Sequence, residues 1–154
     1  MSDPKENATI HLHYDIPGDD FTRAGEASST VKKMLKQIGL PPEVVRRAAI
    51  AMYEGEINVV IHAGGGEMDV DIDKDLIRIV LRDEGPGIPD IALAMRAGYS
   101  TAKSDVCELG FGAGMGLPNM QKNADDLLVE SKIGQGTTVT IKIDVDGGSD
   151  QKIP

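Results

Sequence analysis

Residues 50–63 are the most informative stretch of the sequence: they read Ile-Ala-Met-Tyr-Glu-Gly-Glu-Ile-Asn-Val-Val-Ile-His-Ala and are followed by three glycines. On a helix with about 100° per residue, Glu54 and Asn58 fall within the apolar stripe that faces the core. A buried carboxylate or amide is costly unless it is paired or faces a cavity. The helix therefore predicts a ligand site at Glu54 and Asn58, with His62 at its edge; alternatively, Glu54 and Asn58 are exposed boundary residues. Glu56 falls on the opposite side of the wheel and is predicted to be an ordinary solvated side chain.

The residues around this helix show strand-like and helix-like spacing. Asp19 and Asp20 offer an N-cap for a first helix, and Pro41-Pro42 opens the long helix. Strands are predicted over 8–16, 67–72, 76–82, 127–132 and 137–145, and helices over 21–38, 43–63, 90–97 and 115–124. A loop from about 98 to 114 is long enough to be functional.

The composition favours a globular chain that binds anions without positively charged side chains. The 154 residues carry 16 Lys and Arg against 25 Asp and Glu, a formal net charge of −9, and 40% of them are hydrophobic. Such a charge repels nucleic-acid backbones and anionic lipids. Aromatic residues, at 3%, are too few for base-stacking platforms. An anionic ligand such as a nucleotide must then be held by backbone amides or by a metal ion.

Three glycine-rich segments offer such amides. Residues 83–88 (DEGPGI) follow a predicted strand, and their Asp can accept a hydrogen bond from an exocyclic amine. Residues 110–117 (GFGAGMGL) lead into a helix, so their amides and the helix N-terminus make an anion site. Residues 134–138 (GQGTT) separate the last two strands. Taken one at a time, the segments are also compatible with a strand-to-helix turn, a glycine hinge and a hairpin turn.

Their order along the chain is more specific than any one of them. A helix with Glu-x-x-x-Asn, then Asp-x-Gly-x-Gly after a strand, a Gly-x-Gly-x-Gly loop into a helix and Gly-x-Gly-Thr-Thr before a last strand resembles the four boxes of the GHKL nucleotide-binding superfamily. That superfamily includes gyrase B, histidine kinases and mismatch-repair ATPases. The resemblance covers about residues 8–145. It implies an α/β (α+β) two-layer sandwich, with a mixed, largely antiparallel sheet and helices on one face.

The resemblance also implies roles for individual residues. Glu54 would be the general base, Asn58 would coordinate Mg²⁺, and Asp83 would accept a hydrogen bond from the adenine amine. Residues 98–116 would form a lid over the phosphates of ATP. The residues that the resemblance assigns to nucleotide binding are Asn58, His62, Asp83, Gly85, Gly87, Ile88, Thr101, Gly110, Gly112, Ala113, Gly114, Met115, Gly116, Leu117, Thr137 and Thr138.

Within the superfamily, the chain looks most like the small serine/threonine kinases of bacterial partner-switching systems, the anti-sigma factors and stressosome switch kinases. This likeness implies an Mg·ATP-dependent kinase that phosphorylates a small antagonist or scaffold protein, with a sigma factor or phosphatase as a further partner; whether the chain forms a homodimer stays open. The alternatives are a nucleotide-gated binding module that phosphorylates nothing and a free-standing ATP hydrolase. We expect one domain over residues 1–145, a solvated tail over 146–154 and, without a signal segment or membrane span, a cytoplasmic protein.

Overall fold

Five antiparallel strands form one sheet in the computed structural model, which describes residues 9–18, 22–88, 95 and 116–145. The strands are β1 (Ile10–Pro17), β2 (Gly65–Ile72), β3 (Leu76–Asp83), β4 (Asp126–Lys132) and β5 (Gly136–Asp144). Their order across the sheet is β1-β2-β3-β5-β4, so the last strand lies between β3 and β4. Every pairing among the described strands is antiparallel, which confirms the expected, largely antiparallel sheet. The described strands include no parallel pair.

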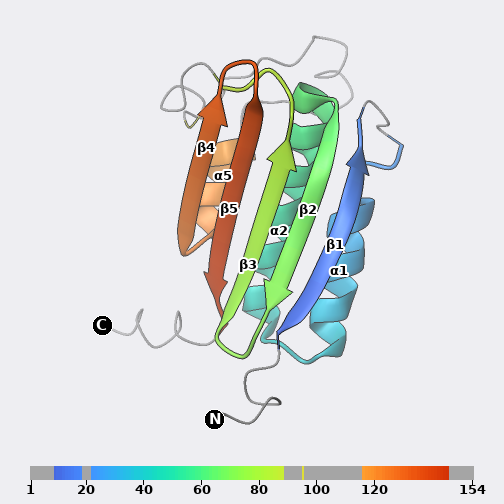
Figure 1. Cartoon of the computed structure of the whole chain (residues 1–154). Helices are drawn as coiled ribbons and strands as arrows, with labels where there is room; N and C mark the ends of the chain where they lie inside the picture. Colours follow the sequence, from blue (N-terminus) through green and yellow to red (C-terminus); the bar gives the residue numbers. More distant parts are fainter. Residues whose placement is uncertain (1–8, 19–21, 89–94, 96–115, 146–154) are drawn as a thin grey trace, which may run out of the picture.

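Alternation along the strands gives the sheet one apolar and one polar face. Met68, Val70 and Ile72 of β2 are buried, whereas the residues between them are partly exposed. The helices α1 (Glu26–Gln37), α2 (Pro42–Asn58) and α5 (Gly116–Asn123) cover the apolar face, with α2 in the middle (Figure 1). The hydrophobic core therefore lies between the sheet and the helices, as expected for a two-layer sandwich.

The central helix is continuous with one π-helical turn, η1 (Val59–Ala63). The two together span the single helix that the sequence predicts, and they end at Gly64, whose φ of 72° is left-handed. Single π-helical turns often occur at functional sites. Here the turn carries His62 toward the end of the sheet where β3 ends.

The first helix begins later than predicted. It starts at Glu26 after Gly25, whose φ is 97°, instead of near residue 21. Gly25 is the N-cap residue and has no side chain that could cap the first turn. The predicted capping residues Asp19 and Asp20 lie outside the described part of the chain.

Glu56 of α2 takes over this capping role, and the prediction that it is solvated is wrong. The residue is 2% exposed. Its Oε2 accepts hydrogen bonds from the backbone N–H groups of Gly25 (2.9 Å) and Ala27 (3.3 Å). Its Oε1 accepts from the Ser28 N–H (2.9 Å) and the Ser28 hydroxyl (2.7 Å). The carboxylate thereby satisfies donors that a helix N-terminus leaves without intrahelical partners.

On its other side, α2 is tied to the junction between α5 and β4. Arg47 is 7% exposed. Its Nε donates to the Asn123 carbonyl at 3.1 Å, and its Nη2 donates to Asp125 Oδ1 at 3.0 Å. The central helix is therefore joined by buried polar contacts to elements on both of its flanks. In the described residues, no helix is long and apolar enough to cross a membrane.

Candidate functional site

The candidate site lies at the end of the sheet where α2 and β3 finish (Figure 1). Three close approaches of glycine backbone bring the elements together there. A Cβ on Gly116, the first residue of α5, would lie 2.9 Å from the amide nitrogen and oxygen of Asn58. A Cβ on Gly85 would lie 2.7 Å from Ala63 Cα, and one on Gly136 would lie 2.0 Å from the Asp83 carbonyl oxygen. Side chains at these glycines would therefore separate α2, β3, β5 and α5.

Asp83 organises the part of the site that lies against the sheet. Its Oδ1 accepts hydrogen bonds from the N–H of Gly85 at 2.9 Å and the N–H of Thr137 at 3.2 Å. The Ser131 hydroxyl accepts from the Ile88 N–H at 2.7 Å and shares a hydrogen bond of 2.8 Å with the Thr137 hydroxyl. These bonds fix the turn after β3 against the β4–β5 hairpin and set the orientation of the Asp83 carboxylate.

Glu54 and Asn58 form the helical part of the site, one turn apart on α2. Both side chains are half-buried. Burial raises the pKa of the Glu54 carboxyl above its ordinary value, and a hydrogen bond with the Asn119 side chain of α5 lowers it by a smaller amount. A carboxylate that is costly to ionise accepts a proton more readily than an exposed one, as a general base requires.

His62 lies one further turn along, in η1. Burial lowers the pKa of its imidazole, so the neutral form is favoured. A neutral imidazole at this position can accept or donate a hydrogen bond, but it adds no positive charge to the site.

The structure brings most of the described candidate residues together. Glu54, Asn58, His62, Asp83, Gly85, Gly87, Ile88, Gly116 and Thr137 all belong to the elements that meet at this end of the sheet. Leu117 is buried in the core beneath α5. Thr138 is paired with Arg82 and, by alternation, lies on the open face of the sheet, which is the face opposite the helices. Thr137 is therefore the threonine that contacts Asp83, through its backbone N–H.

The remaining candidates lie outside the described residues. They are Thr101, Gly110, Gly112, Ala113, Gly114 and Met115, together with most of the predicted lid, the helix predicted over 90–97 and the tail over 146–154.

Two residues of the site were not predicted from the sequence. Ser131 did carry a signal, because it is a polar residue at an inward position of β4 that continues the alternation of Leu127 and Val129. Asn119 carried none, because its contact with Glu54 depends on how α5 packs against α2.

The donor set fits a magnesium nucleotide. Carboxylate and amide oxygens are suitable ligands for Mg²⁺, and Asn58 supplies an amide oxygen beside the first residue of α5, an end of the helix that favours anions. Gly87, with a φ of 85°, lets the loop after β3 approach the β4–β5 turn, where a Cβ would lie 2.6 Å from the Lys132 carbonyl oxygen. The site thus combines an amide oxygen, a half-buried carboxyl group and an aspartate held by backbone N–H groups.

Comparison with known proteins places these features in a family. The model of the histidine kinase-, DNA gyrase B- and HSP90-like ATPases matches residues 43–147. The serine/threonine-protein kinase RsbT of Bacillus subtilis (strain 168) is 30% identical over 112 residues, which cover 70% of this chain and 78% of the relative. The anti-sigma F factor of Geobacillus stearothermophilus is 29% identical over 141 residues, which cover 86% of this chain and 90% of the relative.

A solved structure supports the fold independently. The RsbU and RsbW domains of a Mycobacterium tuberculosis protein superpose with a TM-score of 0.58 at 15% identity. The match covers 87% of this chain and 31% of the longer one. The motifs, the sheet order and the match over residues 43–147 agree, and the chain belongs to the family of histidine kinase-, DNA gyrase B- and HSP90-like ATPases.

Proposed function

We propose that this chain is an Mg·ATP-dependent serine/threonine protein kinase of a partner-switching system, which phosphorylates a small antagonist or scaffold protein. The observation that carries the proposal is the position of Glu54, a half-buried carboxyl group with a raised pKa. It lies one helical turn before Asn58, whose side chain lies beside Gly116, the first residue of α5. A module that only sequesters a partner needs no such base. The name of one relative, a serine/threonine-protein kinase, supports this activity, and the name anti-sigma F factor supports a regulatory role that involves a protein partner.

Each residue would contribute a separate step. ATP supplies the phosphoryl group, and Mg²⁺ neutralises the charge on its phosphates. The Asn58 amide oxygen would hold the metal, and Asp83 would accept a hydrogen bond from the adenine amine through the oxygen that does not bind Gly85 and Thr137. Glu54 would accept the proton of the incoming Ser or Thr hydroxyl, a role that requires the ionised carboxylate.

Substitution of Glu54 separates catalysis from binding. Glu54→Gln keeps the size and the hydrogen-bonding capacity toward Asn119, so we expect ATP affinity within about threefold of the parent and phosphoryl transfer reduced at least about 100-fold. Because the folded state disfavours the ionised Glu54, the variant should be no less stable than the parent at pH 7.5. Glu43→Gln, an exposed position on the same helix, is the matched control and should keep full activity.

In the assay, tagged protein captures its partners from a lysate of the host organism in the presence of Mg·ATP. Mass spectrometry then measures phosphate on each captured protein. Phospho-Ser or phospho-Thr that appears with the parent and Glu43→Gln but not with Glu54→Gln supports the kinase. Partners held in a nucleotide-dependent way but never phosphorylated would replace the kinase with a nucleotide-gated binding module.

Asn58 is expected to affect binding instead. Asn58→Ala removes the proposed metal ligand, so ATP affinity measured by calorimetry should fall about tenfold or more with Mg²⁺ and change little in EDTA. Equal losses under both conditions would contradict the role of Asn58 as a metal ligand.

A further inference from the structure

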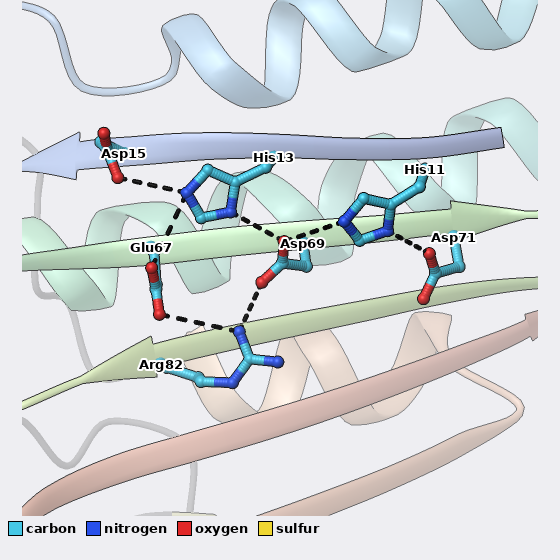
Figure 2. Close-up of polar contacts among 7 residues, drawn as sticks. All are labelled: His11, His13, Asp15, Glu67, Asp69, Asp71 and Arg82. Atoms are coloured by element: carbon cyan, nitrogen blue, oxygen red, sulfur yellow. Dashed lines mark hydrogen bonds and ion pairs between the residues drawn. The ribbon is translucent and has the colours of Figure 1, made fainter.

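A second cluster of polar side chains lies on the open face of the sheet, the face opposite the helices (Figure 2). Strand alternation directs His11, His13 and Asp15 of β1 to this face. The register of β1 with β2 places a carboxylate directly opposite each of them: the pairs are His11 with Asp71, His13 with Asp69, and Asp15 with Glu67. The cluster is separate from the nucleotide site, since the sheet lies between them.

Hydrogen bonds fix the orientation of the His13 ring. Its Nδ1 lies 2.8 Å from Asp69 Oδ1. Asp69 is itself held by Arg82, and its side chain is 14% exposed. An imidazole whose Nδ1–H is donated to a carboxylate carries its lone pair on Nε2, which is the arrangement that second-shell carboxylates impose on histidines that bind metals.

The other ring nitrogen of His13 points toward two further carboxylates. Nε2 lies 3.3 Å from Asp15 Oδ1 and 3.7 Å from Glu67 Oε2 (Figure 2). Two ligands about 2.1 Å from a tetrahedral cation are about 3.4 Å apart, so these separations match those of atoms that share one ion. The ligand atoms of all three residues lie within 4.8 Å of one another. Glu67 uses its other oxygen, Oε1, to contact Arg82.

The charges in the cluster also favour a cation. Four carboxylates are drawn in Figure 2 against one guanidinium, Arg82. With a neutral ring, the lone pair of His13 Nε2 would face two anions. A divalent cation bound by His13 Nε2 and both carboxylates would relieve this repulsion.

We propose that His13, Asp15 and Glu67 form a binding site for one divalent transition-metal ion, with water as the remaining ligand and Asp69 as the residue that orients His13. One nitrogen and two carboxylate oxygens suit Zn²⁺ and its neighbours in the first transition row, whereas Mg²⁺ and Ca²⁺ prefer sites built from oxygen alone. The ion would link the edge strand β1 to β2 on the open face.

The test titrates the full chain, free of any polyhistidine tag and of nucleotide, with Zn²⁺ in excess Mg²⁺. We expect one Zn²⁺ per chain by calorimetry, and Co²⁺ as a second probe should give the visible absorption of a site with a nitrogen ligand. His13→Gln and the double variant Asp15→Asn, Glu67→Gln should each lower the affinity about tenfold or more. His11→Gln is the matched control, because both of its ring nitrogens contact Asp69 or Asp71 instead of the proposed ligands, and it should bind Zn²⁺ within about twofold of the parent.

Three results would overturn the site. One is a parent chain that binds no Zn²⁺ in this titration while NMR shows only the protonation of His13. The second is His13→Gln that binds Zn²⁺ as the parent does. The third is a loss of affinity in His11→Gln as large as in His13→Gln, which would place the ion elsewhere on the face. Circular dichroism of each variant checks that the fold is intact.

Discussion

Two glutamates of α2, only two residues apart, have opposite tasks. Glu54 is half-buried and has a raised pKa, whereas Glu56 accepts four hydrogen bonds from the start of α1. The sequence placed Glu54 in the apolar stripe, with an exposed boundary position as the alternative, and the structure shows it half-buried; the prediction that Glu56 is solvated is wrong. A helical wheel assumes one buried face, but α2 has the sheet, α1 and α5 as neighbours, so more than one face is buried.

The raised pKa of Glu54 predicts how activity depends on pH. In the proposed mechanism, phosphoryl transfer requires the ionised carboxylate of Glu54, so the rate should fall on acidification through a pKa above the ordinary value for glutamate. Asn119→Ala removes the hydrogen bond that lowers this pKa, so the acid limb should move to higher pH while the plateau rate changes less. The measurement is the pH profile of kcat for both proteins. An unmoved acid limb in Asn119→Ala would show that another group sets it.

At the scale of elements, the fold could be predicted from hydrophobic spacing, and the helix boundaries could be predicted only in part. The five strands and the long helix lie where the sequence predicts them, because alternation and helical periodicity are local properties. The start of α1 was predicted too early, since its cap comes from Glu56, 31 residues further along the chain. Contacts of this kind leave no trace in local spacing.

The glutamate cap predicts a large effect on stability. Glu56→Ala leaves three backbone N–H groups without this acceptor, and the Ser28 hydroxyl keeps only its longer contact of 3.3 Å with the Gly25 carbonyl, so we expect the free energy of unfolding to fall by about 3 kcal/mol or more. Glu43→Ala removes an exposed ion pair of the same helix and should cost less than about 1 kcal/mol. Urea denaturation of both variants gives the comparison, and equal losses would contradict the capping role.

Two glycines of the β4–β5 turn offer a second comparison. Both have positive φ, 78° at Gly134 and 125° at Gly136, but a Cβ meets nothing within 4 Å at the first and lies 2.0 Å from the Asp83 carbonyl oxygen at the second. Gly134→Ala should therefore cost about 1 kcal/mol of backbone strain. Gly136→Ala should cost at least about 3 kcal/mol, because β5 must move away from β3. Thermal unfolding and ATP binding of the two variants test this difference.

At the scale of the whole molecule, ligand binding and unfolding are linked, because the site is built from α2, β3, β5 and α5, which share one hydrophobic core. At a free Mg·ATP concentration about 100 times its Kd, the free energy of unfolding should rise by about 2.7 kcal/mol. Denaturation with and without Mg·ATP measures the rise. Asn58→Ala should show a smaller rise at the same nucleotide concentration. An unchanged midpoint in the parent would mean that the folded chain does not bind Mg·ATP.

The order of the strands has a consequence for biosynthesis. β3 leaves the ribosome more than 50 residues before β5, the strand that pairs with its second edge and that brings Thr137 to Asp83. Until β5 has been made, that edge of β3 has no partner in the sheet and resembles the exposed edges that promote aggregation. The nascent polypeptide therefore acquires the candidate site only after β5 has been made and has inserted between β3 and β4.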